Sequence, residues 1–205
     1  MSNGKTYGAL SALAGAAFLF AMSYTPASAQ GMPQGWFKVC SKQQDVDVCN
    51  TLNNVVSETG QPLTIVNLIE FSGKQNQKRL RITVPTGRLI PEGVRVQVGD
   101  APAKKVDYVF CFGPTCVADT VLDDKLLASL KKGTKMTVTS VNFQGGVNPI
   151  DVSLQGFTQA FTGPGMQEKD FEAQQKKLQT AIQAKEKQSA DQLKSVQEKA
   201  KTGNH

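Results

Sequence analysis

Histidine is almost absent from this sequence of 205 residues, because its single copy, His205, is the last residue. This scarcity excludes Ser–His–Asp and Cys–His catalysis, proton transfer by an imidazole, and metal sites built on histidine. The sequence also lacks a GxSxG elbow, a Walker loop and a GxGxxG that follows a predicted strand. We therefore expect no cofactor, no bound metal and none of the enzyme classes that these motifs define.

Carboxylates are the catalytic residue type that the sequence does supply. Glycoside hydrolysis needs only two of them, so no missing motif excludes it. The carboxylates near predicted strands are scattered along the chain, and acids in strand-and-loop proteins are mostly solvated. We predict that the protein is not an enzyme, with a carboxylate-dependent glycan hydrolase as the remote alternative. Its candidate acids are Glu58, Glu70, Asp100, Asp107 and Asp119.

Long apolar runs are missing after residue 30, so no transmembrane segment is expected in the mature protein. The apolar stretch before it, residues 7–22, follows a single cation, Lys5, and precedes an Ala-Ser-Ala site at residues 27–29. This order is typical of a secretory signal peptide, and we predict that residues 1–29 are cleaved. An uncleaved anchor is disfavoured because the run is shorter than a spanning helix needs. The mature protein is expected to be soluble and exported.

Only four cysteines are present, and their spacing does not match a zinc knuckle or a CxxC redox pair. In an exported chain an even number of cysteines indicates disulfides, which stabilise small domains in oxidising compartments. Four cysteines allow three connectivities. We favour the local one, Cys40 with Cys49 and Cys111 with Cys116, because each pair flanks a turn-like stretch.

Excess charge is small, since the formal net charge of +6 falls to +5 when Lys5 leaves with the signal peptide. This excess is too weak to predict nucleic-acid binding, but it is compatible with attraction to anionic surfaces. Residues 73–81 form a basic turn, and a lysine pair lies near it if the chain folds back. This turn predicts a site that binds anionic material. The alternative is that these charges protect an edge strand from pairing. The residues are Lys74, Lys78, Arg79, Arg81, Lys104 and Lys105.

Short alternating segments dominate residues 30–163, the predicted folded domain. In residues 79–84 and 94–98 apolar and polar side chains alternate, whereas residues 64–71 are nearly all apolar, as in a central strand covered on both faces. Gly- and Pro-rich turns separate these segments, and one amphipathic helix is expected after Asp123 or Asp124. The predicted fold is all-β, an antiparallel β-sandwich with one short helix.

Composition changes at Gly163-Pro164-Gly165, after which glycine is absent until Gly203. Residues 164–205 consist of strong helix formers and predict a charged helical or partly disordered tail. The apolar residues of this tail do not fill heptad positions, so no coiled coil is predicted. The alternative to a solvated tail is a helix that pairs with another chain. The apolar residues are Phe171, Leu178, Ile182, Leu193 and Val196.

Three motifs resemble the invasion-associated locus B family of exported bacterial proteins. They are Trp36 with Cys40, Tyr108 with Cys111 and Cys116, and the segment Ser-Leu-Gln-Gly-Phe at residues 153–157. The resemblance covers residues 35–161 and does not extend to the tail. It implies an all-β domain, a periplasmic or surface location in a Gram-negative cell, and an association with host-cell entry. It supplies no catalytic residue.

The sequence therefore predicts an exported, non-catalytic binding protein of the envelope or surface that supports interaction with host cells. Its partner is expected to be an envelope or host-surface macromolecule, with anionic material as the candidate that the basic turn indicates. The alternative is a periplasmic structural or assembly factor that docks a partner through the C-terminal helix. The sequence does not predict an oligomeric state.

Overall fold

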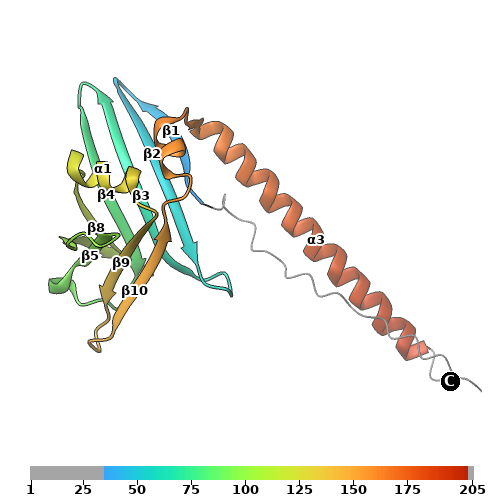
Figure 1. The fold of residues 1–205 in the computed structure, drawn as a ribbon. Coiled ribbons are helices and arrows are strands. Elements are labelled where there is room, and N and C mark those ends of the chain that lie inside the picture. Colours follow the sequence, from blue (N-terminus) through green and yellow to red (C-terminus); the bar gives the residue numbers. More distant parts are fainter. Residues whose placement is uncertain (1–34, 203–205) are drawn as a thin grey trace, which may run out of the picture.

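The computed structural model of the protein describes residues 35–202, so the predicted signal peptide at residues 1–29 and His205 lie outside the described residues. Two β-sheets pack face to face, and a long C-terminal helix extends away from them (Figure 1). The domain is thus a β-sandwich, as the alternating segments predict.

The larger sheet has seven strands in the order β11-β1-β2-β3-β4-β8-β7. Its neighbouring strands are antiparallel, except that the short β11 runs parallel to β1. Consecutive strands joined by short turns produce most of this order. The strands are β1 (Phe37–Gln43), β2 (Val46–Val56), β3 (Pro62–Gly73), β4 (Gln77–Pro85), β7 (Tyr108–Phe112), β8 (Thr115–Val121) and β11 (Met166–Gln167).

The smaller sheet has four antiparallel strands in the order β10-β9-β5-β6. Its strands are shorter than those at the centre of the larger sheet, since β5 has 5 residues and β3 has 12. The inner face of the larger sheet therefore extends beyond the smaller one. The strands are β5 (Val94–Val98), β6 (Lys104–Val106), β9 (Lys135–Val141) and β10 (Val147–Ser153).

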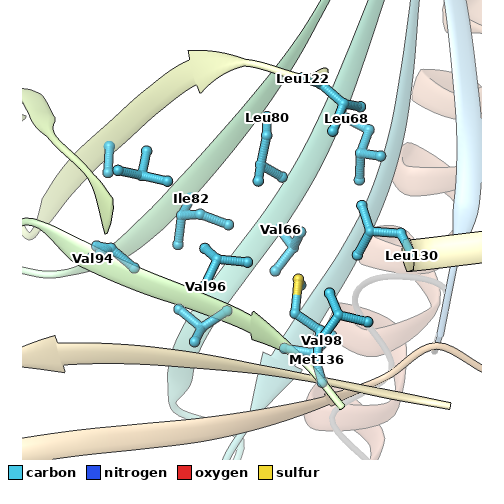
Figure 2. Close-up of a cluster of buried hydrophobic side chains, with 14 of the residues drawn as sticks. Val66, Leu68, Leu80, Ile82, Val94, Val96, Val98, Leu122, Leu130 and Met136 are labelled. Atoms are coloured by element: carbon cyan, nitrogen blue, oxygen red, sulfur yellow. The ribbon is translucent and has the colours of Figure 1, made fainter. Parts of the chain in front are cut away.

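The core lies between the two sheets and is built from alternate residues of their strands. In β4, Leu80, Ile82 and Val84 turn inward, as the alternation of residues 79–84 predicts, and none is more than 3% exposed. They pack against aliphatic side chains of the smaller sheet (Figure 2). The partners across the core include Val94, Val96, Val98, Met136 and Val138.

The central strand β3 differs from its prediction, because only one of its faces is fully covered. Val66 and Leu68 are completely buried in the core, whereas on the opposite face Ile69 is buried but Ile65 and Asn67 are only half-buried. That face lies on the outside of the sandwich, where side chains of neighbouring strands give partial cover. A continuous apolar run therefore does not require a second covering layer in this sheet.

Helices are more numerous than the single short one predicted. The expected helix is α1 (Asp124–Lys132), but a second helix, α2 (Phe157–Thr162), follows β10, and a 3-10 turn, η1 (Ile90–Glu92), precedes β5. The all-β description is therefore only approximate. Phe157 and Phe161 are spaced by four residues, so one turn of helix directs both into the core.

The tail is attached to the sandwich more closely than the composition boundary at residues 163–165 indicates. After Gly163-Pro164-Gly165 the chain adds β11 beside β1 and then forms α3 (Glu168–Thr202), a helix of 35 residues. Gly165 lies directly against the Cys40 sulfur, and a Cβ atom there would overlap it. Only glycine therefore permits this approach of the tail to β1.

Asp123 caps α1, and replacing it with alanine is expected to lower the free energy of unfolding by about 1 kcal/mol. Its carboxylate accepts hydrogen bonds from Lys104 Nζ at 2.6 Å and from Leu126 N at 2.7 Å, and these bonds lower its pKa. A lowered carboxyl pKa stabilises the fold above the unfolded value of about 3.9 and ceases to do so as the pH falls through the folded value.

The difference between the wild type and Asp123→Ala should therefore be largest near neutral pH and disappear in acid. Urea unfolding of both proteins at neutral and acidic pH measures this difference. Asp123→Ser keeps an oxygen at the cap and should retain most of the neutral-pH stability. A pH-independent loss would mean that the carboxylate does not stabilise α1 through its charge.

Candidate functional site

Both cysteine pairs are local disulfides, in the connectivity that the turn-flanking spacing favours. Cys40 and Cys49 occupy directly paired positions of β1 and β2, and Cys111 and Cys116 occupy paired positions of β7 and β8. Each bond therefore joins two strands that are already hydrogen-bonded neighbours. No free cysteine occurs among residues 35–202, and the disulfides brace two hairpins of the larger sheet.

The six predicted basic residues do not form one surface. Lys74 lies at the turn after β3, Lys78 faces the inside of the larger sheet, and Arg79 and Arg81 face its outside, because consecutive strand residues point to opposite faces. Lys104 and Lys105 belong to β6 of the other sheet. Lys104 nevertheless binds Asp123, and the neighbouring Leu122 N–H donates to the Lys78 carbonyl, so Lys104 approaches the end of β4 from the other sheet. Anion binding by these residues stays a prediction.

Five of these six cations also have an acidic partner. Lys74 lies 2.5 Å from Asp45, Lys104 lies 2.6 Å from Asp123, and Lys105 lies 3.0 Å from Asp107. Arg79 and Arg81 both bind Asp119. Within residues 35–202, Lys78 is the member of the set that has no ion pair. An anion approaching the basic turn would therefore compete with carboxylates that are already bound.

Asp119 is the most enclosed of these acids, with a side chain only 3% exposed. The Arg79 Nε donates to its Oδ1 at 2.5 Å and the Arg81 Nε donates to its Oδ2 at 2.9 Å. The three side chains form a cluster on the outer face of β4 and β8. Because both carboxylate oxygens are engaged, Asp119 is a structural residue of this face.

The other four candidate acids are distributed over separate parts of the domain. Glu58 is in the turn between β2 and β3, and Asp100 follows β5. Asp107 precedes β7 and pairs with Lys105, whereas Glu70 lies on the inner face of β3. No cluster of three His, Cys, Asp or Glu side chains suited to a metal ion occurs among residues 35–202. The described chain therefore does not assemble these acids into one centre.

A groove of about 540 Å³ opens where the larger sheet extends beyond the smaller one. Its walls come from β1 to β4 and from the start of α1. Polar and charged side chains alternate around it with a few apolar ones. The lining residues are Lys38, Cys49, Glu70, Phe71, Ser72, Asn76, Gln77, Lys78, Leu122 and Asp124.

Lys38 forms the floor of this groove, and sequence reasoning did not identify it. Its side chain is 12% exposed, lies 3.3 Å from Glu70 Oε2 and donates to the Phe161 carbonyl at 2.7 Å. It also lies 3.5 Å from the Gly163 carbonyl. Lys38 therefore ties β1 to β3 and to the end of α2. The available signal was a lysine at an inward strand position, two residues after Trp36.

Trp36 packs against the core, as expected of an aromatic residue near a disulfide. Its ring centroid lies 4.8 Å from that of Phe157 in an edge-to-face arrangement, and its indole Nε1 donates to the Ser153 carbonyl at 2.7 Å. Phe157 in turn contacts Phe161, with ring centroids 5.5 Å apart. This aromatic cluster fixes α2, and α2 supplies the carbonyls that hold Lys38.

Displaced pKa values do not mark a reactive centre. Besides Asp123, the pKa of Asp151 is lowered by hydrogen bonds from Lys135 and Thr137 on the exposed face of the smaller sheet. Burial raises the pKa of the Tyr108 hydroxyl. None of these three groups lines the groove.

One face of α3 carries an apolar stripe whose exposure increases along the helix. Phe171 stacks on Phe37 of β1 with ring centroids 5.7 Å apart, and Leu178 is half-buried. Farther along, Ile182 is 39% exposed, Leu193 64% and Val196 63%. These residues share one side of a helix with 3.6 residues per turn, although they miss a heptad repeat.

No helix among residues 35–202 is long and apolar enough to cross a membrane.

The four sheet edges are protected to different degrees. β6 carries two lysines, β10 contains Pro149, and β11 is only two residues long and continues into α3. Each of these features blocks strand addition. β7 has no charged residue, and it exposes Val109, Phe110 and Phe112, the last to 82%. A bulge at Val109 is the only irregularity in its pairing with β8.

The structure thus belongs to the class of disulfide-braced β-sandwich proteins with an appended amphipathic helix. The sequence model of the invasion associated locus B (IalB) protein matches residues 36–165, which is most of the chain. The chain therefore belongs to the IalB family. The match ends just before β11, so α3 lies beyond the part that the family defines.

Individual relatives carry the same description. Two proteins of Brucella abortus, from strain 2308 and from biovar 1 strain 9-941, are each named an invasion protein B homolog. Both are 27% identical over 155 residues, which covers 74% of this chain and 87% of the relative. The crystal structure of invasion associated protein B from Bartonella henselae aligns with a TM-score of 0.49 at 19% identity, over 60% of this chain and 92% of that one.

Proposed function

We propose that the protein is an exported, non-catalytic binding protein of the envelope or outer surface of a Gram-negative cell, and that α3 docks it onto another macromolecule. The observation that carries this proposal is the exposed apolar stripe of α3. A helix that ends in solvent normally presents polar residues all round, whereas a one-sided stripe indicates a face that becomes covered.

Export is supported by the leader sequence and by the local disulfides, which persist in oxidising compartments. The names of the Brucella and Bartonella relatives connect the family with invasion. From that connection we infer a binding role that supports interaction with a host cell. If the protein instead stays in the periplasm, docking through α3 would make it a structural or assembly factor of the envelope.

A role without catalysis is supported by the state of the carboxylates. Asp119 is held between two arginines, and Glu70 is tied to Lys38. The remaining candidates, Glu58, Asp100 and Asp107, lie in separate turns. A glycan hydrolase needs two carboxyl groups on either side of one bond, and this distribution does not favour it.

The shape of α3 indicates the chemistry of its partner. The stripe is one residue wide along much of the helix, and glutamine and lysine surround it. A narrow stripe of this kind fits a helix or a helix-sized apolar groove in another protein better than it fits a lipid surface, which needs a broad apolar face. The partner is therefore expected to be another envelope or host-surface protein with an apolar docking strip.

Crosslinking in living cells tests this proposal, with a photoreactive residue placed at position 189 between Ile182 and Leu193. The unaltered chain is expected to give a defined crosslinked product. Leu193→Asp with Val196→Asp should abolish that product, because two charges on the stripe would have to be buried. Far-UV circular dichroism and disulfide content should show that the β-sandwich remains folded.

The matched control places the same charges on the opposite face of α3, as Ala184→Asp with Ser195→Asp. This variant should retain the product. Deletion of residues 167–205 should remove it as well. If the stripe variant and the opposite-face variant crosslink equally, or if the only product is a dimer of this chain, the docking proposal is wrong.

A further inference from the structure

The groove above Lys38 has the composition of a binding site, although it is separate from the α3 stripe. Lys38 and Glu70 form its floor, and both are largely buried, with side chains 12% and 23% exposed. All three ammonium protons of Lys38 have acceptors within the protein. The Glu70 carboxylate binds Lys38 through Oε2 and has no other partner among residues 35–202, so it retains capacity to accept a further hydrogen bond.

Opposite charges without ion pairs stand at the rim of the groove. Lys78 comes from β4, where it lies in register with Glu70, and Asp124 is the first residue of α1. Within residues 35–202 neither makes a salt bridge or a side-chain hydrogen bond, whereas most cations of this domain have an acidic partner. The groove thus presents one available donor group and one available carboxylate, and its four charges sum to zero.

Neutral polar groups fill the space between these charges. Ser72, which lies on the same face of β3 as Glu70, makes no side-chain hydrogen bond to any residue in the range 35–202, and the Asn76 amide uses only its Nδ2, which donates to the Gly73 carbonyl at 3.2 Å. An amide and a hydroxyl each offer both donors and acceptors. Leu122, 4% exposed, adds apolar contact beside them.

We propose that this groove binds a small neutral saccharide, as a free sugar or as a unit of a larger glycan. Sugar hydroxyls donate and accept hydrogen bonds in close succession, and sugar rings also carry apolar C–H faces. The mixture of carboxylate, ammonium, amide and hydroxyl groups matches the first property, and Leu122 matches the second. A volume of about 540 Å³ is within the range of small-ligand sites.

Other ligand classes fit the lining less well. Glu70 and Asp124 would repel a sulfate or phosphate group, and Lys38 and Lys78 would repel a cation. An apolar ligand would leave the unpaired polar groups desolvated without partners. A neutral, hydrogen-bonding ligand avoids each of these penalties.

Titration of the purified mature chain with chitobiose, lactose and maltose tests this inference, with chemical shifts of backbone amides as the readout. At least one of the three should bind saturably and shift the amides of residues 70–78 and 122–124. Ser72→Ala should weaken that binding about three- to ten-fold, because it removes one ordinary hydrogen bond. Ser72 is exposed, so the thermal unfolding of the variant should be unchanged.

The matched control is Ser189→Ala, which makes the same change on the exposed surface of α3, outside the groove. It should bind as the wild type does. The inference is overturned if none of the three sugars binds up to the millimolar range, if Ser72→Ala binds as well as Ser189→Ala, or if a sulfated heparin disaccharide alone shifts these amides. The assay requires no partner of α3, so failure here does not affect the docking proposal.

Discussion

Replacing Phe157 with alanine is expected to lower the free energy of unfolding by about 4 kcal/mol, the largest effect of any single substitution considered for this protein. Phe157 is completely buried and is among the largest fully buried side chains. Its ring lies between Trp36 and Phe161, so truncation leaves a cavity that rigid aromatic neighbours cannot close. Because α2 holds the carbonyls that bind Lys38, the floor of the groove should loosen as well.

Urea unfolding under oxidising conditions measures this loss, with fluorescence of Trp36, the single tryptophan, and far-UV circular dichroism as two probes. Phe143→Ala is the matched control, because Phe143 is 70% exposed at a turn and should change stability by less than about 0.5 kcal/mol. Equal losses for the two variants would mean that α2 does not pack into the core as described.

Asp119→Ala should destabilise the fold by about 2 kcal/mol through a different mechanism, namely unpaired charge on the outer face. The substitution leaves Arg79 and Arg81 side by side without the carboxylate that binds them. Breaking a fully buried pair costs about 3–5 kcal/mol, but these arginines are 30% and 40% exposed and can regain water. The expected loss is therefore smaller than the buried limit.

Denaturant unfolding of Asp119→Ala and Asp45→Ala distinguishes an enclosed ion cluster from an exposed pair. Asp45 and Lys74 are 67% and 76% exposed, and such pairs contribute between zero and about 1 kcal/mol. Salt should reduce the effect of Asp119→Ala only in part, since Asp119 is enclosed whereas the two arginines are partly exposed. If Asp119→Ala is no more harmful than Asp45→Ala, the cluster does not stabilise β4 and β8.

The parts of the fold that follow from local pattern could be predicted from the sequence. The alternation of residues 79–84 identified both β4 and the face that it buries, and the alternation of residues 94–98 identified β5. The expected cap at Asp123 or Asp124 located the start of α1. Each of these features depends on residues within a few positions of one another, where periodicity and capping determine the structure.

Features that depend on pairing between distant strands could not be predicted in this way. Lys38 reads as one more surface lysine until α2 and β3 are placed beside β1, more than a hundred residues away for α2. Arg79 and Arg81 read as a basic edge because Asp119, which neutralises them, lies on a strand 38 residues beyond Arg81. The charges of the two arginines are therefore already paired in space, and anion binding at the basic turn stays a prediction.

The attachment of α3 to the sandwich determines how far the end of the helix lies from the β-sheets. Phe171 is fixed against Phe37, and β11 is fixed beside β1, so the helix starts at a defined point of the sandwich. A helix rises about 1.5 Å per residue, which places Val196 roughly 38 Å farther along its axis than Phe171. Under the docking proposal, a partner bound at the far end of α3 is held tens of ångströms from the sandwich, and a tilt of the helix by a few degrees at Phe37 moves that partner by several ångströms.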